Sequence, residues 1–417
     1  MTDYRDRVVE GELASRMTAM GAVLIDGPKA VGKTVTALRM AKTELRMDTD
    51  RAARATLSID PEQLFEHPTP ILFDEWQETP QIWDLVRRAV DDHAGKGLYV
   101  LTGSARPRDN ARMHSGAGRI GRVRMRPMSL LETGHSSGAV SLAGLLDGID
   151  PVGRPAPLSV PELIQRIVIG GWPDLLNASE SQARAWLVDY VRALAEVDVP
   201  GLGPRRNPRN VLRLLSALGR ASSTPLNQSA LASDVGGDSG AIASETLTNY
   251  LDALERLMLL EPLPAWRPHL RSRTRLRATP VHHFVDPSLG VAAMGSGSQG
   301  LLADLEAAGL QFESMVLRDL RVYAQALNPA WSSWRDSQTG DEVDAILELP
   351  DGRWAGFKIK LGETAADAAA STLLTCARKI DFSKHGPPLA LVVVTGGRFT
   401  YRRPDGVCVV PITALGP

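Results

Sequence analysis

The sequence predicts an α/β fold that begins with a parallel sheet covered by helices on both faces. Apolar runs at residues 22–25, 71–73 and 98–101 alternate with segments of helical character, and this alternation is typical of βα units in a parallel sheet. Residues that bear chemistry follow the first two runs: a glycine-rich loop follows one, and Asp74 and Glu75 follow the other. C-terminal to the residues of this sheet we expect a helical middle region and then a second, smaller α/β region.

The composition is that of a globular protein without an overall attraction to polyanions. The 417 residues are 43% hydrophobic and 23% charged, which suits about two to four domains of ~150 residues each. Because the net charge is −1, any binding to nucleic acid or membrane needs a local patch. The charged N-terminus and the lack of a long apolar run predict a cytoplasmic protein that does not span a membrane. Cys376 and Cys408 have no metal-type spacing and are expected to be free thiols.

The loop at residues 27–34 has the spacing G-x-x-x-x-G-K-[ST] and lies between an apolar run and a predicted helix at 35–44. This context separates it from a chance glycine turn. Glycines at both ends let backbone N–H groups surround a phosphate, and the helix N-terminus adds its positive dipole end. We expect Lys33 to reach the β- and γ-phosphates and the Thr34 hydroxyl to bind Mg²⁺. The predicted nucleotide-binding residues are Gly27, Pro28, Lys29, Ala30, Val31, Gly32, Lys33 and Thr34.

The pair Asp74-Glu75 supplies the second half of the predicted site. It ends an apolar strand roughly 40 residues after the glycine loop. Asp74 is expected to belong to the Mg²⁺ shell, and Glu75 is expected to polarise the attacking water. The strand at 98–104 is expected between the two nucleotide-bearing strands, where Thr102 or Ser104 can sense the γ-phosphate. A plain strand-to-turn transition is the alternative for these hydroxyl residues.

The remaining N-terminal elements are predicted from their patterns. Residues 8–20 and 80–93 have the periodicity of helices, and residues 56–60 have the alternation of a short strand. Arg119 lies where an arginine can act on the phosphate of a neighbouring subunit. A basic, solvated strand is an equally good interpretation of the arginines that follow it, Arg122, Arg124 and Arg126.

Several motifs beyond the glycine loop belong to one pattern. They are Phe73–Gln77, Leu101–Ser104, Gly118-Arg119 with Pro127–Glu132, Gly170–Asp174, Trp186–Val191 with Asp198-Val199, and Phe284–Leu289. Together with the loop they resemble a large prokaryotic family that joins an AAA-type ATPase domain to a C-terminal domain of unknown function. The resemblance covers nearly the whole chain. It implies a P-loop NTPase sheet of the AAA type and ATP as the nucleotide, but no biological role.

The domain organisation follows from the same elements. Helices predicted at 161–169 and 182–197 form a small lid over the nucleotide, and another helix is predicted at 211–218. A segment rich in Gly, Ser and Pro at 134–159 indicates an interdomain linker. The predicted divisions are an ATPase domain at 1–135, a linker at 136–160, a lid and winged-helix-like domain at 161–294, and an endonuclease-like domain at 295–417.

Residues 227–263 have the pattern of a winged helix-turn-helix, with one helix capped by Asn227, a longer helix over 245–258 and a wing strand at 259–263. Binding of DNA through the longer helix is one interpretation. A packing or protein-contact module is favoured, because an acidic helix face binds a polyanion poorly. The face in question carries Glu245, Asp252 and Glu255 against Arg256. An arginine-rich run follows, which can contact nucleic acid nonspecifically or form a solvated loop: Arg267, Arg271, Arg273, Arg275 and Arg277.

The last region is similar to the restriction-endonuclease-like core that ends many members of the family. Such cores hold a metal with a helix Glu, a strand Asp and a Glu that lies two residues before a Lys. Glu313, Asp344 and Lys360 match these positions, but Lys358 stands where the third carboxylate is expected. A cation there removes a ligand and repels the metal. We therefore expect the core to persist as a fold without metal-dependent cleavage.

The sequence thus predicts a Mg²⁺-dependent ATP-binding protein with slow hydrolysis. Lys33, Glu75, Ser104 and Arg119 are the predicted catalytic residues, and Thr34 and Asp74 the predicted metal ligands. The favoured function is a nucleotide-gated switch that acts on a protein partner, and a homo-oligomer is left open. The alternative is a DNA-associated ATPase of defence or mobile-element control that uses the arginine runs.

Overall fold

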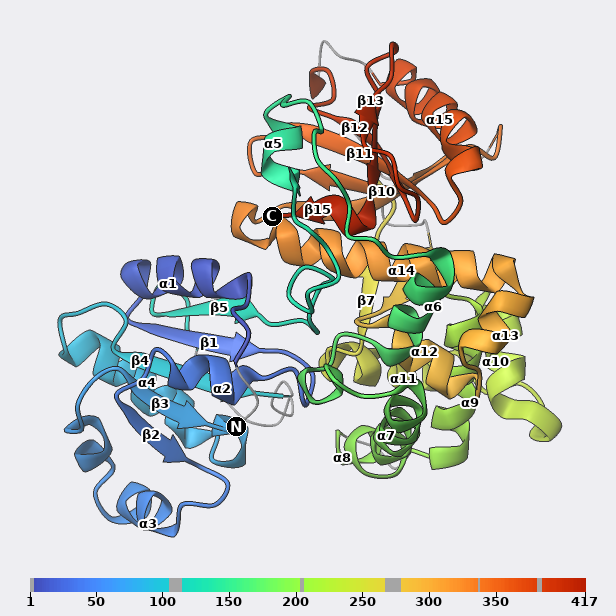
Figure 1. The fold of residues 1–417 in the computed structure, drawn as a ribbon. Coiled ribbons are helices and arrows are strands. Elements are labelled where there is room, and N and C mark those ends of the chain that lie inside the picture. Colours follow the sequence, from blue (N-terminus) through green and yellow to red (C-terminus); the bar gives the residue numbers. More distant parts are fainter. Residues whose placement is uncertain (1–3, 105–114, 203–205, 267–278, 337, 381–384) are drawn as a thin grey trace. The chain divides into compact units, whose positions relative to one another are not determined.

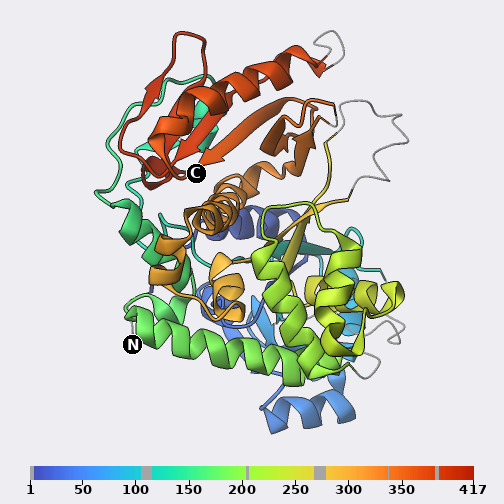
Figure 2. The ribbon, with the colours of Figure 1, turned by 90° about the vertical axis from the view of Figure 1, so that its right-hand side faces the viewer.

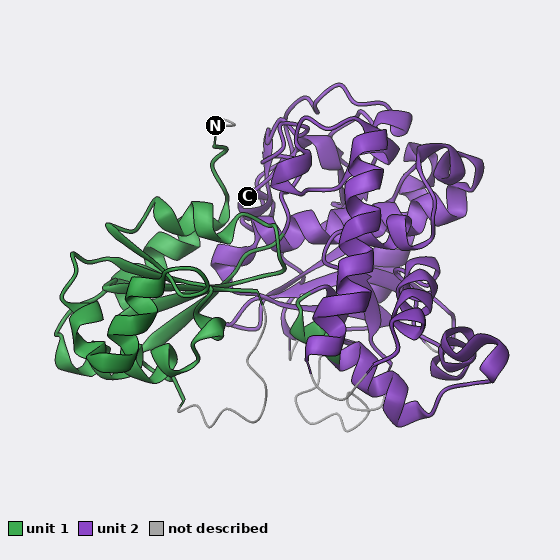
Figure 3. Cartoon of the chain, turned by 90° about the horizontal axis from the view of Figure 1, so that it is seen from below, with its two compact units in different colours: residues 1–126, 253–258 green, residues 127–252, 259–417 purple. Residues whose placement is uncertain are grey.

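The computed structural model divides the chain into two compact units (Figure 3). Unit 1 comprises residues 1–126 together with 253–258, and unit 2 comprises residues 127–252 and 259–417. The residues that the structure describes are 4–104, 115–202, 206–266, 279–336, 338–380 and 385–417. Within these ranges, no helix is both long and apolar enough to cross a membrane.

Unit 1 contains a five-stranded, wholly parallel sheet, as predicted (Figure 1). Its strands are β1 (Ala22–Asp26), β2 (Thr43–Arg46), β3 (Ile71–Asp74), β4 (Tyr99–Gly103) and β5 (Ile120–Arg124), in the order β2-β3-β4-β1-β5. The prediction that the strand at 98–104 lies between the two nucleotide-bearing strands is confirmed, because β4 pairs with both β1 and β3. Both strand ends that carry chemistry therefore meet at one edge of the sheet.

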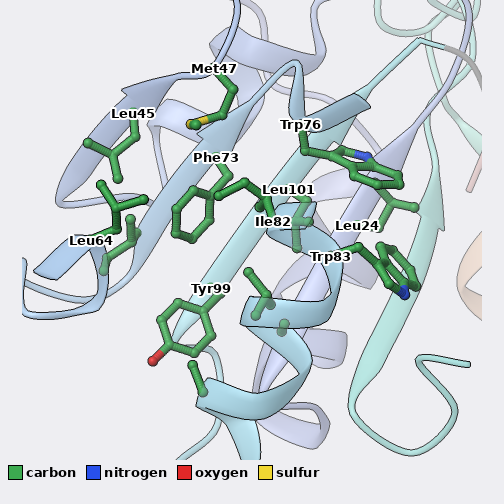
Figure 4. Packing of buried hydrophobic residues seen from close by; sticks show 14 of the residues in the cluster. Leu24, Leu45, Met47, Leu64, Phe73, Trp76, Ile82, Trp83, Tyr99 and Leu101 are labelled. Carbon is green, nitrogen blue, oxygen red and sulfur yellow. The ribbon is translucent and has the colours of Figure 1, made fainter. Parts of the chain in front are cut away.

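Helices and an aromatic core support this sheet. The helices are α1 (Val9–Ala19), α2 (Lys33–Leu38), α3 (Arg51–Ile59) and α4 (Gln81–Asp92), and α1 and α4 match the helices predicted at 8–20 and 80–93. Ile82 and Trp83 of α4 pack with Phe73 and Leu101 of the neighbouring strands and with Trp76 of the turn after β3 (Figure 4). Burial of these large side chains holds the carboxyl ends of β3 and β4 in place.

The strand predicted at 56–60 is wrong, because these residues lie in helix α3 and the loop at its end. The Asp50 carboxylate accepts a hydrogen bond from the Ala53 N–H and caps this helix. Ala53 and Leu57, four residues apart, are buried on one helix face. The strand next to β3 instead comes earlier, at Thr43–Arg46, so the helix predicted at 35–44 ends at Leu38.

The first part of unit 2 is helical. Its helices are α6 (Val160–Ile169), α7 (Glu180–Ala193) with a π-helical turn at Leu194–Asp198, α8 (Val199–Gly201), α9 (Pro208–Arg220), α10 (Gln228–Gly236), α11 (Ser244–Arg256), α12 (Pro287–Ala293), α13 (Ser298–Ala303) and α14 (Leu305–Tyr323). The last residues of α11, from 253 on, belong to unit 1. Strands β7 (Leu260–Leu263) and β8 (Val281–Phe284) form an antiparallel pair, and Pro225 bridges to Val281. The helices predicted at 161–169, 211–218 and 245–258 and the helix predicted after the Asn227 cap are confirmed, and the one at 182–197 is α7 with its π-helical turn.

A mixed six-stranded sheet forms the other part of unit 2. Its strands are β9 (Ala330–Arg335), β10 (Glu342–Glu348), β11 (Trp354–Lys360), β12 (Leu391–Thr395), β13 (Tyr401–Arg402) and β14 (Cys408–Pro411), in the order β13-β14-β12-β11-β10-β9. Strands β11, β12 and β14 are parallel, whereas β9, β10 and β11 are antiparallel. Helix α14 lies on one side of this sheet and helix α15 (Ala366–Arg378) on the other (Figures 1 and 2).

The segment expected as a linker, 136–160, is packed into unit 2. Strand β6 (Val140–Ser141) pairs with β15 (Leu415–Gly416), and the Ser136 hydroxyl donates to the Leu415 carbonyl. The short helix α5 (Leu142–Leu146) buries three leucines. These apolar side chains are buried, so the segment packs within unit 2 and is not an extended linker. The chain passes from unit 1 to unit 2 between residues 126 and 127.

Three of the sequence motifs meet in unit 2 around buried charges on α14. The Arg318 guanidinium forms ion pairs of 2.7 Å with Asp286 and with Asp319. Asp286 accepts from the Gly171 N–H, and Asp319 accepts from the Leu130 N–H. Segments 127–132, 170–174 and 284–289 are thereby held on one helix, and each buried charge has a partner.

Candidate nucleotide-binding site

The glycine loop, residues 27–34, joins strand β1 to helix α2. Ala30 and Gly32 have positive φ angles of 63° and 92°, a conformation that glycine adopts without strain. A side chain at position 27 would place its Cβ 2.2 Å from the Met125 carbonyl oxygen. Gly27 is therefore required by the close approach of Met125, the residue after β5. A glycine loop that leads into a helix N-terminus can present backbone N–H groups to an anion.

Lys33 is buried at the first turn of α2, with 6% of its surface exposed. Its Nζ donates to the Gly27 and Pro28 carbonyl oxygens at 3.0 and 2.8 Å. Burial lowers the pKa of Lys33 to about 8, against the opposing effect of Glu75, Asp74 and Asp26. The ammonium therefore lies inside the loop on neutral oxygen acceptors, which phosphate oxygens can replace.

Asp74 joins the loop to two strands. Its Oδ1 accepts a hydrogen bond of 2.8 Å from the Thr34 hydroxyl, and the same oxygen accepts from the Thr102 hydroxyl. Asp74 and Thr102 are both buried. A hydroxyl and a carboxylate side by side match the preference of Mg²⁺ for oxygen ligands, with its remaining ligands coming from phosphates and water. The residues present therefore fit a magnesium ion bound together with a nucleotide.

Glu75 follows β3 in a left-handed conformation, with φ 51° and ψ 46°. Its carboxylate accepts a hydrogen bond from the Gln77 side chain. A Cβ at Gly103 would lie 2.7 Å from the Gln77 Oε1 and 2.9 Å from the Trp76 Nε1. The glycine at the end of β4 thus lets the Trp76–Gln77 turn approach and orient Glu75.

Two predicted catalytic residues differ in their distance from this centre. Ser104 is buried at the end of β4, but the hydroxyl that contacts Asp74 belongs to Thr102. Arg119 precedes β5, and its carbonyl accepts from the Ala22 N–H at the start of β1. It therefore lies at the opposite edge of the sheet from the loop, where its guanidinium pairs with Asp91 at 2.8 Å. A role for Arg119 at a neighbouring subunit stays a prediction.

A second charged cluster lies between β10 and β11 in unit 2. Lys358 Nζ pairs with Asp344 Oδ1 at 2.5 Å and with Glu342 at 3.3 Å, and the Ile359 N–H donates to the other Asp344 oxygen. Burial, together with the charge of Asp344, raises the pKa of Glu313 on α14 well above its usual range. Among the residues described, no group of three His, Cys, Asp or Glu side chains could hold a metal ion.

The structure gives no support for nucleic-acid binding by the arginine-rich run or by helix α11. The arginine-rich run at Arg267, Arg271, Arg273, Arg275 and Arg277 lies outside the described residues. Glu245 and Asp252 of α11 are exposed, which keeps this helix face acidic.

Sequence reasoning missed three neighbours of the nucleotide loop. Gln77 reaches Glu75 from two residues away, and Met125 packs its carbonyl against Gly27. Arg7 donates to the carbonyl of Val31 from 24 positions earlier in the chain. The register between β1 and β5 brings Met125 to Gly27. Spacing along the sequence carries no signal for this contact or for the one between Arg7 and Val31.

Comparisons with known proteins agree with this geometry. Residues 20–134 match the family model of an AAA domain. Residues 160–300 and 308–415 match two families described as domains of unknown function. No curated protein matches the sequence.

Solved structures similar to this chain include a Walker-type ATPase from Pyrococcus abyssi and two RuvB variants from Thermotoga maritima. The first is 13% identical over 70% of this chain and 96% of its own, with a TM-score of 0.40. The RuvB structures are 15% and 14% identical, each over 61% of this chain and 89% of its own, with TM-scores of 0.29 and 0.25. The matched AAA-domain region, residues 20–134, includes every residue of the glycine loop and the Asp74-Glu75 pair.

Proposed function

We propose that this protein is a Mg²⁺-dependent, slow ATPase that acts as a nucleotide-gated switch. The observation that carries the proposal is the shared contact of Thr34 and Thr102 on one oxygen of Asp74. It joins the loop that would hold the phosphates, the strand end that would hold the metal and the strand that would sense the γ-phosphate.

Binding of ATP would use groups that the loop already presents. Backbone N–H groups of residues 27–34 surround the β-phosphate, and Lys33 exchanges its carbonyl partners for phosphate oxygens. Thr34 and Asp74 would hold the metal ion. When bound, Mg²⁺ neutralises negative charge that develops on the β- and γ-phosphates.

Hydrolysis would depend on Glu75, which accepts a proton from the attacking water or orients that water. The hydrogen bond from Gln77 fixes the direction of the Glu75 carboxylate. The position of Arg119 at the far edge of the sheet supports slow turnover by a single chain, because an arginine that stabilises the transition state would then come from a neighbouring subunit.

The switch would act through the chain segment that leaves unit 1. Strand β5 pairs with the loop-bearing strand β1 and continues into residues 127–132. In unit 2, the Met128 N–H donates to Gly171, the Leu130 N–H to Asp319, and the Leu131 N–H to the Tyr323 hydroxyl. A displacement of β5 would therefore be transmitted to α14. The shift in population between the two conformations of the switch is limited by the difference in their affinities for the nucleotide.

We further propose that the second sheet is an endonuclease-like core without metal-dependent cleavage. Lys358 fills the position of a carboxylate ligand and holds Asp344 in an ion pair. The middle helices with the β7–β8 pair are proposed as a winged-helix-like module that contacts a protein, because the exposed acidic residues of α11 would repel a phosphate backbone. A DNA-associated ATPase is the competing function, supported by the arginine-rich run.

The experiment that separates these functions is a steady-state ATPase assay with and without duplex DNA. Glu75→Gln is the blank, because it removes the proposed base and retains the loop. A basal rate above the blank that does not respond to DNA supports the switch with a protein partner. Stimulation by DNA that disappears at high salt supports the DNA-associated function. A wild-type rate equal to the blank contradicts the ATPase and leaves a nucleotide-binding protein.

A further inference from the structure

Arg7 lies behind the glycine loop and is nearly completely buried, with 6% of its surface exposed. Its Nη1 donates to the Val31 carbonyl at 2.9 Å, and its Nη2 donates to the Arg126 carbonyl at 2.7 Å. One guanidinium thus joins a peptide of the glycine loop to the last residue of the first segment of unit 1. The planar fork of an arginine suits this two-point contact, which a lysine cannot reproduce.

The contact with Val31 fixes a peptide plane in the loop. In a trans peptide the carbonyl and the following N–H point in opposite directions. Because the Val31 carbonyl points toward Arg7, the N–H of Gly32 points away from Arg7. The positive charge on the carbonyl side also favours this orientation of the peptide dipole, with its N–H end directed at an anion.

The chain holds Arg7 in this position from both sides. The Arg7 N–H donates to the Glu10 carboxylate at 3.0 Å, at the start of α1. Before it, the Tyr4 hydroxyl donates to Glu10 at 2.5 Å and lies 3.0 Å from the Thr36 hydroxyl on α2. The Arg39 guanidinium lies 4.3 Å from the centre of the Tyr4 ring. Segment 4–10 is therefore tied to the helix that starts at the glycine loop.

We propose that Arg7 is a positioning residue for the nucleotide site: it holds the Val31–Gly32 peptide in its phosphate-binding orientation and links it to the Arg126 carbonyl. This inference rests on the proposed function, since it assigns a role within the same ATP site. Arg7 does not touch the phosphates and acts through the loop. Loss of such support misplaces a hydrogen-bond donor, which costs affinity for the anion even when the protein stays folded.

The test compares Arg7→Ala with Arg7→Lys and with Arg5→Ala. Arg5 is the matched control, because it lies two residues away on the same segment, is exposed and carries the same charge. The dissociation constant for Mg²⁺-ATP is measured by titration calorimetry at a temperature well below the unfolding midpoint of every variant. The unfolding midpoint without nucleotide is measured separately, so that stability and affinity are read independently.

We expect Arg7→Ala to weaken ATP binding about tenfold, the range for loss of a charged hydrogen bond. Arg7→Lys should fall between Arg7→Ala and wild type, because a lysine keeps the charge and can reach one carbonyl at a time. Arg5→Ala should bind as wild type does. If Arg7→Ala cannot be purified, Arg7→Gln takes its place with the same expected loss.

A purely structural Arg7 would lower the unfolding midpoint and leave the dissociation constant unchanged, and this result overturns the inference. Equal losses in Arg7→Ala and Arg5→Ala overturn it as well, because the effect would then be one of net charge. If wild type itself fails to bind Mg²⁺-ATP, the proposed function falls and the role of Arg7 falls with it. Wild-type binding with normal affinity in Arg7→Ala overturns only the role of Arg7.

Discussion

Two buried lysines, Lys33 in unit 1 and Lys358 in unit 2, show what decides whether a charged site stays open to a ligand. Lys33 rests on two backbone carbonyls of its own loop, and burial lowers its pKa to about 8. Lys358 pairs directly with Asp344. Burial opposes its charge too, but Asp344 together with Glu342 and Glu313 outweighs burial and raises the pKa of Lys358 above its usual value.

The difference lies in the acceptors. Carbonyl oxygens are neutral, so an arriving phosphate offers Lys33 a stronger partner than it loses. A buried carboxylate already neutralises Lys358, and removal of either partner leaves an uncompensated charge. Lys33 can therefore exchange its carbonyl partners for a phosphate, whereas Lys358 stays in its ion pair with Asp344.

The largest effect is expected for Lys33→Ala, which removes the exchangeable cation. ATP binding should be lost, with affinity reduced at least about a hundredfold, because each charged hydrogen bond to phosphate contributes about 1.5–3 kcal/mol. Titration calorimetry measures this directly. Lys42→Ala, an exposed lysine beyond α2, is the control and should bind normally. Micromolar affinity in Lys33→Ala would contradict the assignment of the loop.

Glu75→Gln should separate binding from turnover. The proposed base is removed while the loop, Lys33 and Asp74 remain, so ATP affinity should stay within about threefold of wild type. The turnover number should fall by about 10²–10⁴-fold, the usual contribution of general base catalysis. Single-turnover phosphate release measures the rate. A variant that hydrolyses ATP at the wild-type rate would move the base to another residue.

Lys358→Ala tests the fixed lysine. The change leaves Asp344 buried without its cation, which should lower the free energy of unfolding by about 3 kcal/mol. Urea unfolding followed by tryptophan fluorescence measures this loss, and the half-buried Lys360 on the same strand serves as the control through Lys360→Ala. An unchanged stability would mean that the pair is not formed. Tight Mn²⁺ binding by wild type that depends on Asp344 would contradict the proposal of an inactive core.

The smallest effect is the pH dependence of ATP binding. The pKa of Lys33 is lowered to about 8 from 10.5, so the ammonium is present at pH 7 and is lost as the pH rises through 8. Affinity should fall toward about tenfold per pH unit above pH 8, since one unit corresponds to about 1.4 kcal/mol. The phosphates stay fully ionised in this range, because their second pKa is about 6. Constant affinity from pH 7 to about 9.5 would place the pKa of Lys33 higher.

The sequence predicted the parts of unit 1 that repeat a local chemical pattern. The loop spacing, the acidic strand end and the alternation of strands and helices predicted β1, β3 and β4. Their order was expected from the class of ATPase that these motifs indicate, and the structure confirms it. The strand predicted at 56–60 is wrong because an alternation over five residues is a weak signal. The Asp50 cap that starts helix α3 decides the structure of this segment. The sequence left Thr102 and Ser104 as alternatives for a sensor of the γ-phosphate, and this role stays a prediction. In the structure the Thr102 hydroxyl donates to Asp74, a contact that the sequence did not predict.

The rest of the candidate site depends on contacts between segments distant in the sequence. Arg7 and Val31 are 24 residues apart, and Arg7 and Arg126 are 119 apart. Neither contact follows from a repeat, a spacing or a charge run. In unit 2, the turn residues at 134–159 indicated a linker, but β6 of this segment pairs with β15, and Leu142, Leu145 and Leu146 are buried.

The anchoring of Leu130 to Asp319 has a consequence for biosynthesis. These residues are 189 positions apart, and a chain grows at about 5–20 residues per second, so roughly 10–40 s separate their synthesis. During this interval the sheet of unit 1 can already pair its strands, while the segment after it still lacks the helix that receives its N–H groups. Contacts over such long separations close slowly. We therefore expect the nascent protein to contain a folded ATPase sheet followed by segment 127–132 with unpaired backbone N–H groups. Chaperones can bind this segment until α14 has been synthesised.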